Sequence, residues 1–373
     1  MEPSSSARRT RALAMVVGLL MLPACQGSAG PADTTGSDNV VLHLASIDAV
    51  NVDGHSFGPQ TFVDSLASVS AGRLTAQVAE GYGDGSAEVE TTMVKDIAAG
   101  RLDGGWPALR AFAAAGIPGL KAVEAPMTIT SYAAEIDLVS GPVADHLLGQ
   151  LTGTGVVGLG LIRGPLRRPF AAQQPLLSPA DWVGAPFRVF NSPVQAEVVS
   201  ALGATPVNVG ANWIDSVMAG TLRGAEFNVV QYWSNGLTTE AGNVTSDVVL
   251  WPRPSVLSLS QQRYDSLTEQ QQQWVREASR QAVQAAGNTI DDESFAANQL
   301  CLQGVRFFRA GPDQIRALHS KVQPVIDALA ADPTSGPLLK EIQAIAANHP
   351  TTDVPVVAAE CATAGGTVTA TGP

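Results

Sequence analysis

Arg188 is the residue whose type and position point most directly to binding chemistry. It lies in the apolar run 187–190, which we expect to form a central β-strand ending at a cleft. A guanidinium group is a planar fork of donors that can hold both oxygens of a carboxylate. The alternative is a structural ion pair with an acidic neighbour such as Asp181, because a buried charge needs a partner. Arg188 is therefore our first candidate for holding a carboxylate group.

The residue patterns of covalent and metal catalysis are missing from the sequence. It contains no H-E-x-x-H, G-x-S-x-G or G-x-x-x-x-G-K-[ST] motif. Residues 153–158 match G-x-G-x-x-G, but we expect a helix before them and a strand after them, the reverse of a dinucleotide-binding turn. We expect no cofactor and no metal site, since the five histidines show no ligand-like spacing: His43, His55, His146, His319 and His349.

Length and composition limit the class of protein. The chain has 373 residues, 45% hydrophobic and 15% charged, with a net charge of −12. This length favours two domains, and the apolar fraction is sufficient for a buried core. The acidic balance argues against nucleic acid as a partner, because nucleic-acid binding depends on basic patches.

The order of elements that must position Arg188 is typical of α/β folds. We expect strands at 40–45 and 74–79, helices at 57–70 and 88–99, and a third strand from about 102. This alternation indicates parallel sheets with crossover helices. Further strands are expected at 156–162 and 187–190, and further helices at 195–202, 211–219, 268–286, 313–331 and 337–347.

We therefore expect two α/β lobes, each a mostly parallel sheet flanked by helices, with a ligand cleft between them and a helical C-terminal third. The predicted lobe I comprises residues 39–165 and about 254–293. The predicted lobe II comprises 166–253 and about 294–349, and 350–373 form a loose tail.

The N-terminus has the pattern of an export signal. Arg8, Arg9 and Arg11 precede an apolar run over 12–23, which is shorter than the about 20 residues of a membrane-spanning helix. Residues 22–25, L-P-A-C, are similar to a bacterial lipobox, so we expect a signal peptide at 1–24 and a lipid on Cys25. The alternative is an ordinary cleaved signal with Cys25 a bystander. Residues 25–38 are polar and predict a flexible tether.

Export has a consequence for the two remaining cysteines. Cys301 and Cys361 would lie outside the reducing cytosol, where a disulfide between them is stable. The alternative is one buried thiol and one thiol in the tail.

Several runs resemble one family in the right order. Residues 177–189 read L-S-P-A-D-W-V-G-A-P-F-R-V, 202–207 read L-G-A-T-P-V, and 219–228 read A-G-T-L-R-G-A-E-F-N. Shorter runs stand at 68–74, 100–104 and 124–127. Together they resemble the DctP-like substrate-binding proteins of tripartite ATP-independent periplasmic (TRAP) transporters over about residues 40–348. The resemblance implies a two-lobe periplasmic-binding-protein-like fold of the class II type.

The resemblance also implies roles for particular residues. Arg188 matches the arginine that holds the ligand's carboxylate in this family. Arg168 stands 20 residues earlier, where many members carry a supporting arginine, although the neighbouring Arg167 leaves the register open. Asn191 stands at a position that lines the cleft.

Three further candidates come from the same comparison and from residue type. Asn228 matches a ligand-facing asparagine, but Phe227 is interposed after Glu226, so either Phe227 or Asn228 faces the ligand. Trp106 and Trp213 are candidate aromatic walls of the site, with core packing as the alternative for each.

The function implied is that of a receptor rather than an enzyme. We expect a monomer on the outer face of the cell membrane that captures a small organic acid and presents it to an ion-driven membrane permease. Alternatives are a receptor of an ABC-type importer or a sensor, and a secreted hydrolase with an unrecognised carboxylate pair. The sequence leaves the identity of the acid open.

Overall fold

The structure is a computed structural model that describes residues 39–48, 58–288 and 292–364. The predicted signal peptide 1–24, Cys25 and the tether lie outside the described residues. All described residues belong to one unit, Asn39–Pro373. None of the helices described in it is long and apolar enough to cross a membrane.

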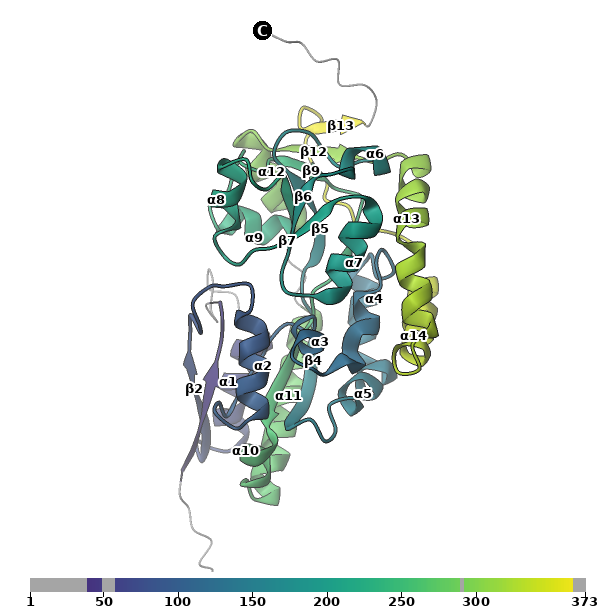
Figure 1. The fold of residues 1–373 in the computed structure, drawn as a ribbon. Helices are drawn as coiled ribbons and strands as arrows, with labels where there is room; N and C mark the ends of the chain where they lie inside the picture. Colours follow the sequence, from purple (N-terminus) through teal and green to yellow (C-terminus); the bar gives the residue numbers. More distant parts are fainter. Residues whose placement is uncertain (1–38, 49–57, 289–291, 365–373) are drawn as a thin grey trace, which may run out of the picture. The chain divides into compact units, whose positions relative to one another are not determined.

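A five-stranded sheet organises the first half of this unit, which we call lobe I (Figure 1). The strands β1 and β2 are parallel, as predicted for strand–helix–strand connections, and β3 joins β1 in parallel. A strand from much later in the chain, β11, pairs antiparallel with β3 and β4. The order is β2 (Leu74–Ala79), β1 (Val40–Ala45), β3 (Gly104–Gly105), β11 (Ser255–Ser260) and β4 (Val156–Ile162).

A second, eight-stranded sheet organises lobe II. The strand β5 lies in its middle and is antiparallel to β8, β9 and β10, whereas β6 is parallel to β7 and β8. The order is β13 (Ala362–Ala364), β12 (Arg306–Arg309), β9 (Asn243–Thr245), β5 (Leu166–Ala171), β8 (Gly224–Phe227), β6 (Pro186–Val189) and β7 (Thr205–Asn208), with β10 (Trp251–Pro252) beside β5.

The helices of lobe I bury its sheet. The apolar faces of α1 and α11 pack together, placing Phe62 and Leu66 against Val275 and Ala278. Burying such side chains contributes roughly 1.5–3 kcal/mol each to folding. The helices are α1 (Gly58–Val69), α2 (Val89–Ala98), α3 (Ala111–Ala114), η1 (Pro118–Glu124), α4 (Tyr132–Ser140), α5 (Pro142–Gly149), α10 (Gln261–Asp265) and α11 (Glu269–Asn288).

The helices of lobe II cover both faces of its sheet. Figure 1 shows α8, α9 and α12 on one side and α7 and α13 on the other. An aromatic cluster packs under α8 and α9, where Phe170 and Tyr232 stack with ring centroids 4.6 Å apart. The helices are α6 (Pro179–Trp182), α7 (Pro193–Leu202), α8 (Trp213–Met218), α9 (Val229–Ser234), α12 (Glu293–Leu302), α13 (Pro312–Ala331) and α14 (Ser335–Asn348).

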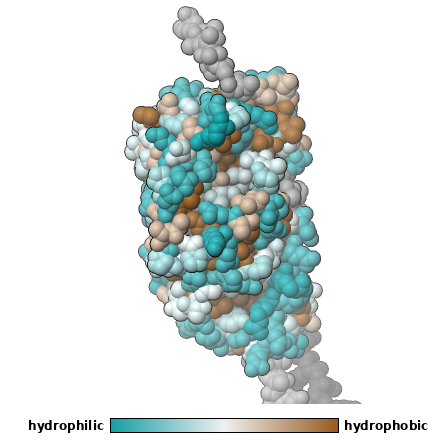
Figure 2. Space-filling model, turned by 90° about the vertical axis from the view of Figure 1, so that its right-hand side faces the viewer, coloured by the Kyte–Doolittle hydropathy of each residue, from teal (hydrophilic) through white to brown (hydrophobic). Residues whose placement is uncertain are grey.

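The two C-terminal helices contact different lobes. The helix α13 packs on α7 of lobe II, but α14 packs on η1, α4 and α5 of lobe I, although we predicted both for lobe II. The remaining lobe boundaries stay a prediction. On the face that carries α13 and α14, hydrophilic and hydrophobic residues are interspersed (Figure 2).

Two short segments connect the sheets and lie against each other. One joins β4 to β5 and the other joins β10 to β11. The Arg253 nitrogen donates to Pro165 O at 3.1 Å, and a Cβ on Gly164 would lie 1.7 Å from Arg253 O. Only glycine permits this backbone approach, so the pair of segments forms a tight junction between the lobes.

The prediction of a loose tail from residue 350 is wrong for residues 350–364. The Asp353 nitrogen donates to Thr130 O at 3.0 Å in lobe I, and the Ala358 nitrogen donates to Asn298 Oδ1 at 2.9 Å in lobe II. Cys361 forms a disulfide with Cys301, with Cα atoms 5.7 Å apart. The segment is held because backbone hydrogen bonds and the disulfide compensate for its weak apolar pattern.

Candidate functional site

Arg188 lies on β6 with its guanidinium group buried between the lobes. Its Nε donates to Val209 O at 2.8 Å and its Nη2 to Gly210 O at 3.1 Å. The carboxylate nearest to its Nη1 is that of Glu226, 4.0 Å away. Asp181, the alternative partner, instead accepts hydrogen bonds from the backbone nitrogens of Leu177 and Ser178. Asp181 is therefore not the partner of Arg188.

Glu226 on β8 is the carboxylate around which the arginines gather. It is completely buried and pairs closely with Arg167 of β5. Its Oε1 lies 3.3 Å from Arg110 Nη1, which comes from lobe I. Burial alone would raise the pKa of Glu226, but the charges of Arg167 and Arg110 outweigh it and lower that pKa below its usual value.

Lobe I completes the cluster with two arginines that share one carboxylate. Arg110 Nε lies 2.8 Å from Glu90 Oε2, and Arg253 Nη2 lies 2.6 Å from Glu90 Oε1. Although burial opposes ionisation, the two arginines lower the pKa of Glu90 to about 2. We call these six residues the arginine cluster: Glu90, Arg110, Arg167, Arg188, Glu226 and Arg253.

The arginine cluster carries a surplus of positive charge. Four guanidinium groups face two ionised carboxylates within the cluster, which leaves a net charge of 4 − 2 = +2 for these six residues. A third carboxylate, Glu124, acts on Arg110 from outside the cluster, and burial raises its pKa to about 7. Burial lowers the pKa of Arg188 to about 9, so Arg188 is still charged at neutral pH. An unbalanced buried charge is costly, and an anion entering the cluster would reduce that cost.

Aromatic rings border the guanidinium groups. The Phe190 ring centroid lies 4.5 Å from Arg110 Cζ and 4.9 Å from Arg188 Cζ. Trp213 lies 5.8 Å from Arg188, and Phe227 lies 4.9 Å from Arg167, both within the range of cation–π attraction. Trp213 is thus a core residue that also borders the cluster.

The side chains of Phe227 and Asn228 have different surroundings. Phe227 faces Arg167, whereas Asn228 caps α9 by accepting a hydrogen bond from the Gln231 nitrogen at 2.7 Å. The Asn228 amide also donates to Gln231 Oε1 at 3.0 Å. Phe227 therefore borders the arginine cluster, whereas the Asn228 side chain is bonded to α9.

Arg168 points away from the cluster. Neighbouring residues on a strand project to opposite faces, so Arg167 enters the cluster and Arg168 enters the junction with the C-terminal segment. Its guanidinium group donates to Ser246 O at 2.9 Å, Glu293 Oε1 at 2.8 Å and Asp353 O at 2.7 Å. All three contacts are with other parts of the protein, and Arg167, not Arg168, lies in the arginine cluster.

Asn191 and its neighbours join the two lobes beside the site. Asn191 has a positive φ of 46°, uncommon for a residue with a side chain, and its Nδ2 donates to Thr91 Oγ1 at 3.0 Å. Asn208 Nδ2 donates to Glu88 Oε1 at 2.9 Å, and the Ala211 nitrogen donates to Gly85 O at 2.8 Å. These contacts hold the lobes together.

Trp106 does not join the arginine cluster. Its Nε1 donates to Ser46 Oγ at 2.9 Å, and its ring packs against the core of lobe I. The arginine cluster does include Arg110, Arg253 and Glu90, but none of them lies in a motif that marked it in the sequence. Only the two prolines flanking Arg253 hint at a fixed backbone there.

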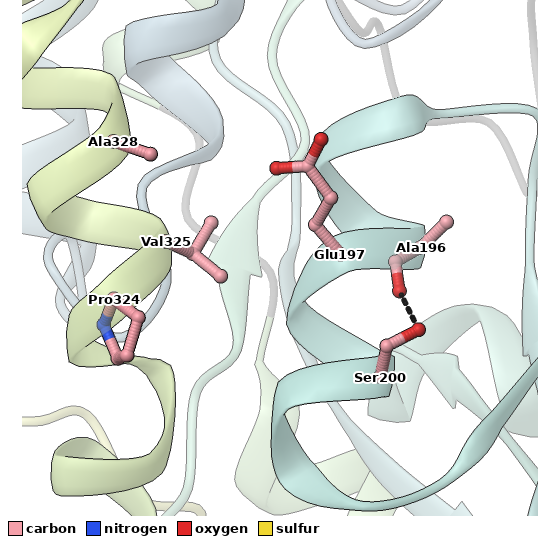
Figure 3. Close-up of a pocket in the computed structure, with 6 residues that line it drawn as sticks. All are labelled: Ala196, Glu197, Ser200, Pro324, Val325 and Ala328. Carbon is pink, nitrogen blue, oxygen red and sulfur yellow. Dashed lines mark hydrogen bonds between the residues drawn. The ribbon is translucent and has the colours of Figure 1, made fainter.

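Two cavities accompany the site. An enclosed one borders Arg110 and Arg253 and also contains Glu124 and Gln195. A separate surface groove of about 390 Å³ lies between α7 and α13, where Glu197 extends toward the side of Val325 and the Ser200 hydroxyl donates to Ala196 O at 2.8 Å (Figure 3). No residue of the arginine cluster lines this groove. Within 39–48, 58–288 and 292–364, no group of three His, Cys, Asp or Glu side chains could hold a metal ion.

Two α/β lobes that meet over a buried cationic site define a solute-binding protein. The chain belongs to the DctP family, described as bacterial extracellular solute-binding protein, family 7, whose sequence model matches residues 56–332. Its members bind solutes outside the cytoplasm, and they are not enzymes.

Individual relatives agree with this membership. A solute-binding protein of Chromohalobacter salexigens is 24% identical over 233 residues, 61% of this chain and 68% of that protein. The ectoine-binding periplasmic protein TeaA of Halomonas elongata is 27% identical over 161 residues, 41% of this chain and 46% of TeaA.

Solved structures share the two-lobe fold. A TRAP periplasmic solute-binding protein from a Sulfitobacter species, with bound β-D-galacturonate, aligns with a TM-score of 0.72 and 21% identity over 82% of this chain and 99% of that one. A second, from Chromohalobacter salexigens with bound D-glucuronate, aligns with a TM-score of 0.72 and 18% identity, with coverage of 82% and 99%.

Proposed function

We propose that this protein is the extracytoplasmic receptor of a TRAP-type transporter and that it binds a small organic acid at the arginine cluster. Arg188 would bind the carboxylate of the acid, and Arg167 and Arg110 would contribute to the positive field. The observation that carries this proposal is the net charge of +2 in a buried site.

Arg188 is the arginine best placed for the ligand. Arg110, Arg167 and Arg253 each lie within 3.3 Å of a carboxylate oxygen, whereas Arg188 has its nearest one at 4.0 Å. Its two backbone hydrogen bonds fix the plane of the guanidinium group. A group that is already oriented loses little entropy when it binds a carboxylate.

The comparisons favour an acid as the solute. Two proteins of this fold hold the uronic acids galacturonate and glucuronate. The solved structures that share this fold are TRAP periplasmic solute-binding proteins, which favours a TRAP permease over an ABC importer as the partner. The predicted signal peptide and a lipid on Cys25 would keep the receptor at the membrane that contains this permease.

A thermal-shift screen of the exported chain against organic acids tests the proposal. An acid at 100 times its Kd should stabilise the protein by about 2.7 kcal/mol. Arg188→Met should abolish the shift, while Arg316→Met, on the exposed face of α13, should keep it. Mass spectrometry of the recovered acid should find it unaltered. Absence of any hit, or chemical conversion of the hit, would contradict the proposal.

A further inference from the structure

The enclosed cavity beside the arginine cluster draws its walls from both lobes. Glu124 ends η1 in lobe I, and Gln195 lies in the first turn of α7 in lobe II. The cavity has a volume of about 10 Å³, which is room for about one water-sized group. Arg110, Glu124, Gln195 and Arg253 supply its polar lining.

Two hydrogen-bond acceptors in this cavity are buried without a partner. Glu124 is 3% exposed and Gln195 is 1% exposed. Ser192 Oγ donates to Glu124 Oε2 at 2.5 Å, but neither Glu124 Oε1 nor Gln195 Oε1 has a hydrogen-bond partner among the described residues. Most buried polar atoms in proteins are hydrogen-bonded, so two orphaned acceptors in one cavity indicate a place for a donor.

The charges around the cavity restrict which donor fits. An ammonium group of the ligand would be repelled by the guanidinium groups of Arg110 and Arg253. A second carboxylate of the ligand would be repelled by Glu124, and it could only accept hydrogen bonds, so it could not donate to either acceptor. A hydroxyl group donates to Glu124 or Gln195 and accepts from an arginine, and its oxygen has the size of a water molecule. A hydroxyl group therefore meets both the charge and the volume of the cavity.

Arg110 connects this cavity to the place of the carboxylate. It lines the cavity, and its Nη1 lies 3.3 Å from Glu226 Oε1, which in turn lies 4.0 Å from Arg188. We propose that Glu124 and Gln195 form a subsite for a hydroxyl group, so that the receptor selects hydroxylated organic acids over their deoxy counterparts. This inference rests on the proposed function, because the hydroxyl group belongs to the acid held by Arg188.

The position of the two acceptors adds a role in closure. Because Glu124 comes from lobe I and Gln195 from lobe II, a hydroxyl group between them would lie where the two lobes meet. Its one proton can be donated to only one of the two acceptors, and an acid without the hydroxyl group would leave that acceptor unpaired as well. Sites built to bind a hydroxyl group reject the analogue that lacks it strongly.

Calorimetry with matched pairs of acids tests the inference. The probes are D-galacturonate against tetrahydropyran-2-carboxylate, D-gluconate against hexanoate, and L-lactate against propionate. For at least one pair we expect the hydroxy acid to bind about 100-fold more tightly than its deoxy counterpart. Gln195→Leu, which removes one acceptor and keeps the volume, should reduce this ratio to below tenfold. Glu124→Gln, which keeps the shape, is a second variant in case Gln195→Leu fails to fold.

Glu135→Gln is the matched control. Glu135 is also buried and also has one oxygen, Oε2, without a partner, but its Oε1 accepts from the Gly164 nitrogen at the junction between the lobes. This variant should leave the ratio unchanged.

The outcomes separate the two proposals. Equal binding of both members of every pair that binds would overturn the subsite and leave the receptor function intact. Equal loss of both members in Gln195→Leu and Glu124→Gln would also overturn the subsite, because a purely structural role predicts that result. If no acid of either kind binds, the proposed function fails, and the subsite fails with it.

Discussion

Arg110 Nη1 of lobe I lies 3.3 Å from Glu226 Oε1 of lobe II, and this contact joins the two lobes at the centre of the arginine cluster. Glu226 is at the same time the closest partner of Arg167. The charge network thus includes residues of both lobes, so under the proposed function lobe closure and ligand binding would depend on the same electrostatic balance.

Glu226→Gln should destabilise the protein, because it removes the negative charge that three arginines face. Breaking a buried pair typically costs about 3–5 kcal/mol. Urea unfolding at pH 7 measures this change. Glu277→Gln is the control, since Glu277 forms an exposed pair with Arg280, and exposed pairs contribute little to stability. Equal stability of the two variants would show that the cluster contributes no more than a surface pair.

Gly210→Ala should weaken acid binding by obstructing lobe closure. A Cβ at Gly210 would lie 2.0 Å from Gly85 O in the other lobe, a backbone atom that has no rotamer to escape. We expect at least tenfold weaker binding by calorimetry and a larger radius of gyration by X-ray scattering. Gly149→Ala is the control, because a Cβ there meets no atom within 4 Å. Unchanged affinity in Gly210→Ala would mean that binding does not require this approach of the lobes.

Stability should fall as pH rises from about 5 to 8. Burial raises the pKa of Glu124 to about 7 and that of Glu135 to about 8, above the usual 4.5. Between the unfolded and folded pKa values the folded state holds more protons, so each group lowers stability by up to about 1.4 kcal/mol per pH unit. Urea unfolding at four pH values measures the slope. Glu124→Gln and Glu135→Gln should each flatten it, and an unaltered slope in both would refute the assignment.

Loss of the Cys301–Cys361 disulfide should destabilise the protein. The bond closes a loop with a sequence separation of 60, for which chain entropy predicts about 4 kcal/mol. Melting with and without reductant measures the effect. The double variant Cys301→Ala with Cys361→Ala should melt like the reduced protein and ignore reductant. A wild-type melting temperature that reductant does not change would contradict the prediction.

Local patterns in the sequence predicted the strands and helices around Arg188, because alternation and helical spacing report on nearest neighbours. They could not predict that Arg110 and Arg253 meet Glu226, since these contacts join distant segments from two lobes. Strand alternation could have distinguished Arg167 from Arg168 only if the inward face of β5 had been known. The C-terminal segment was missed because its hydrogen bonds and disulfide leave no apolar period.

The most direct test of the central claim is calorimetry of the best acid from the screen with wild-type protein, Arg188→Met and Arg188→Lys at pH 7.5. Truncating one partner of a buried charge pair costs about 2–5 kcal/mol, so we predict about 100-fold weaker binding to Arg188→Met. Arg188→Lys should bind with intermediate affinity, because it keeps the charge and loses the planar fork. Wild-type affinity in a folded Arg188→Met variant would contradict the assignment of the arginine cluster as the acid-binding site.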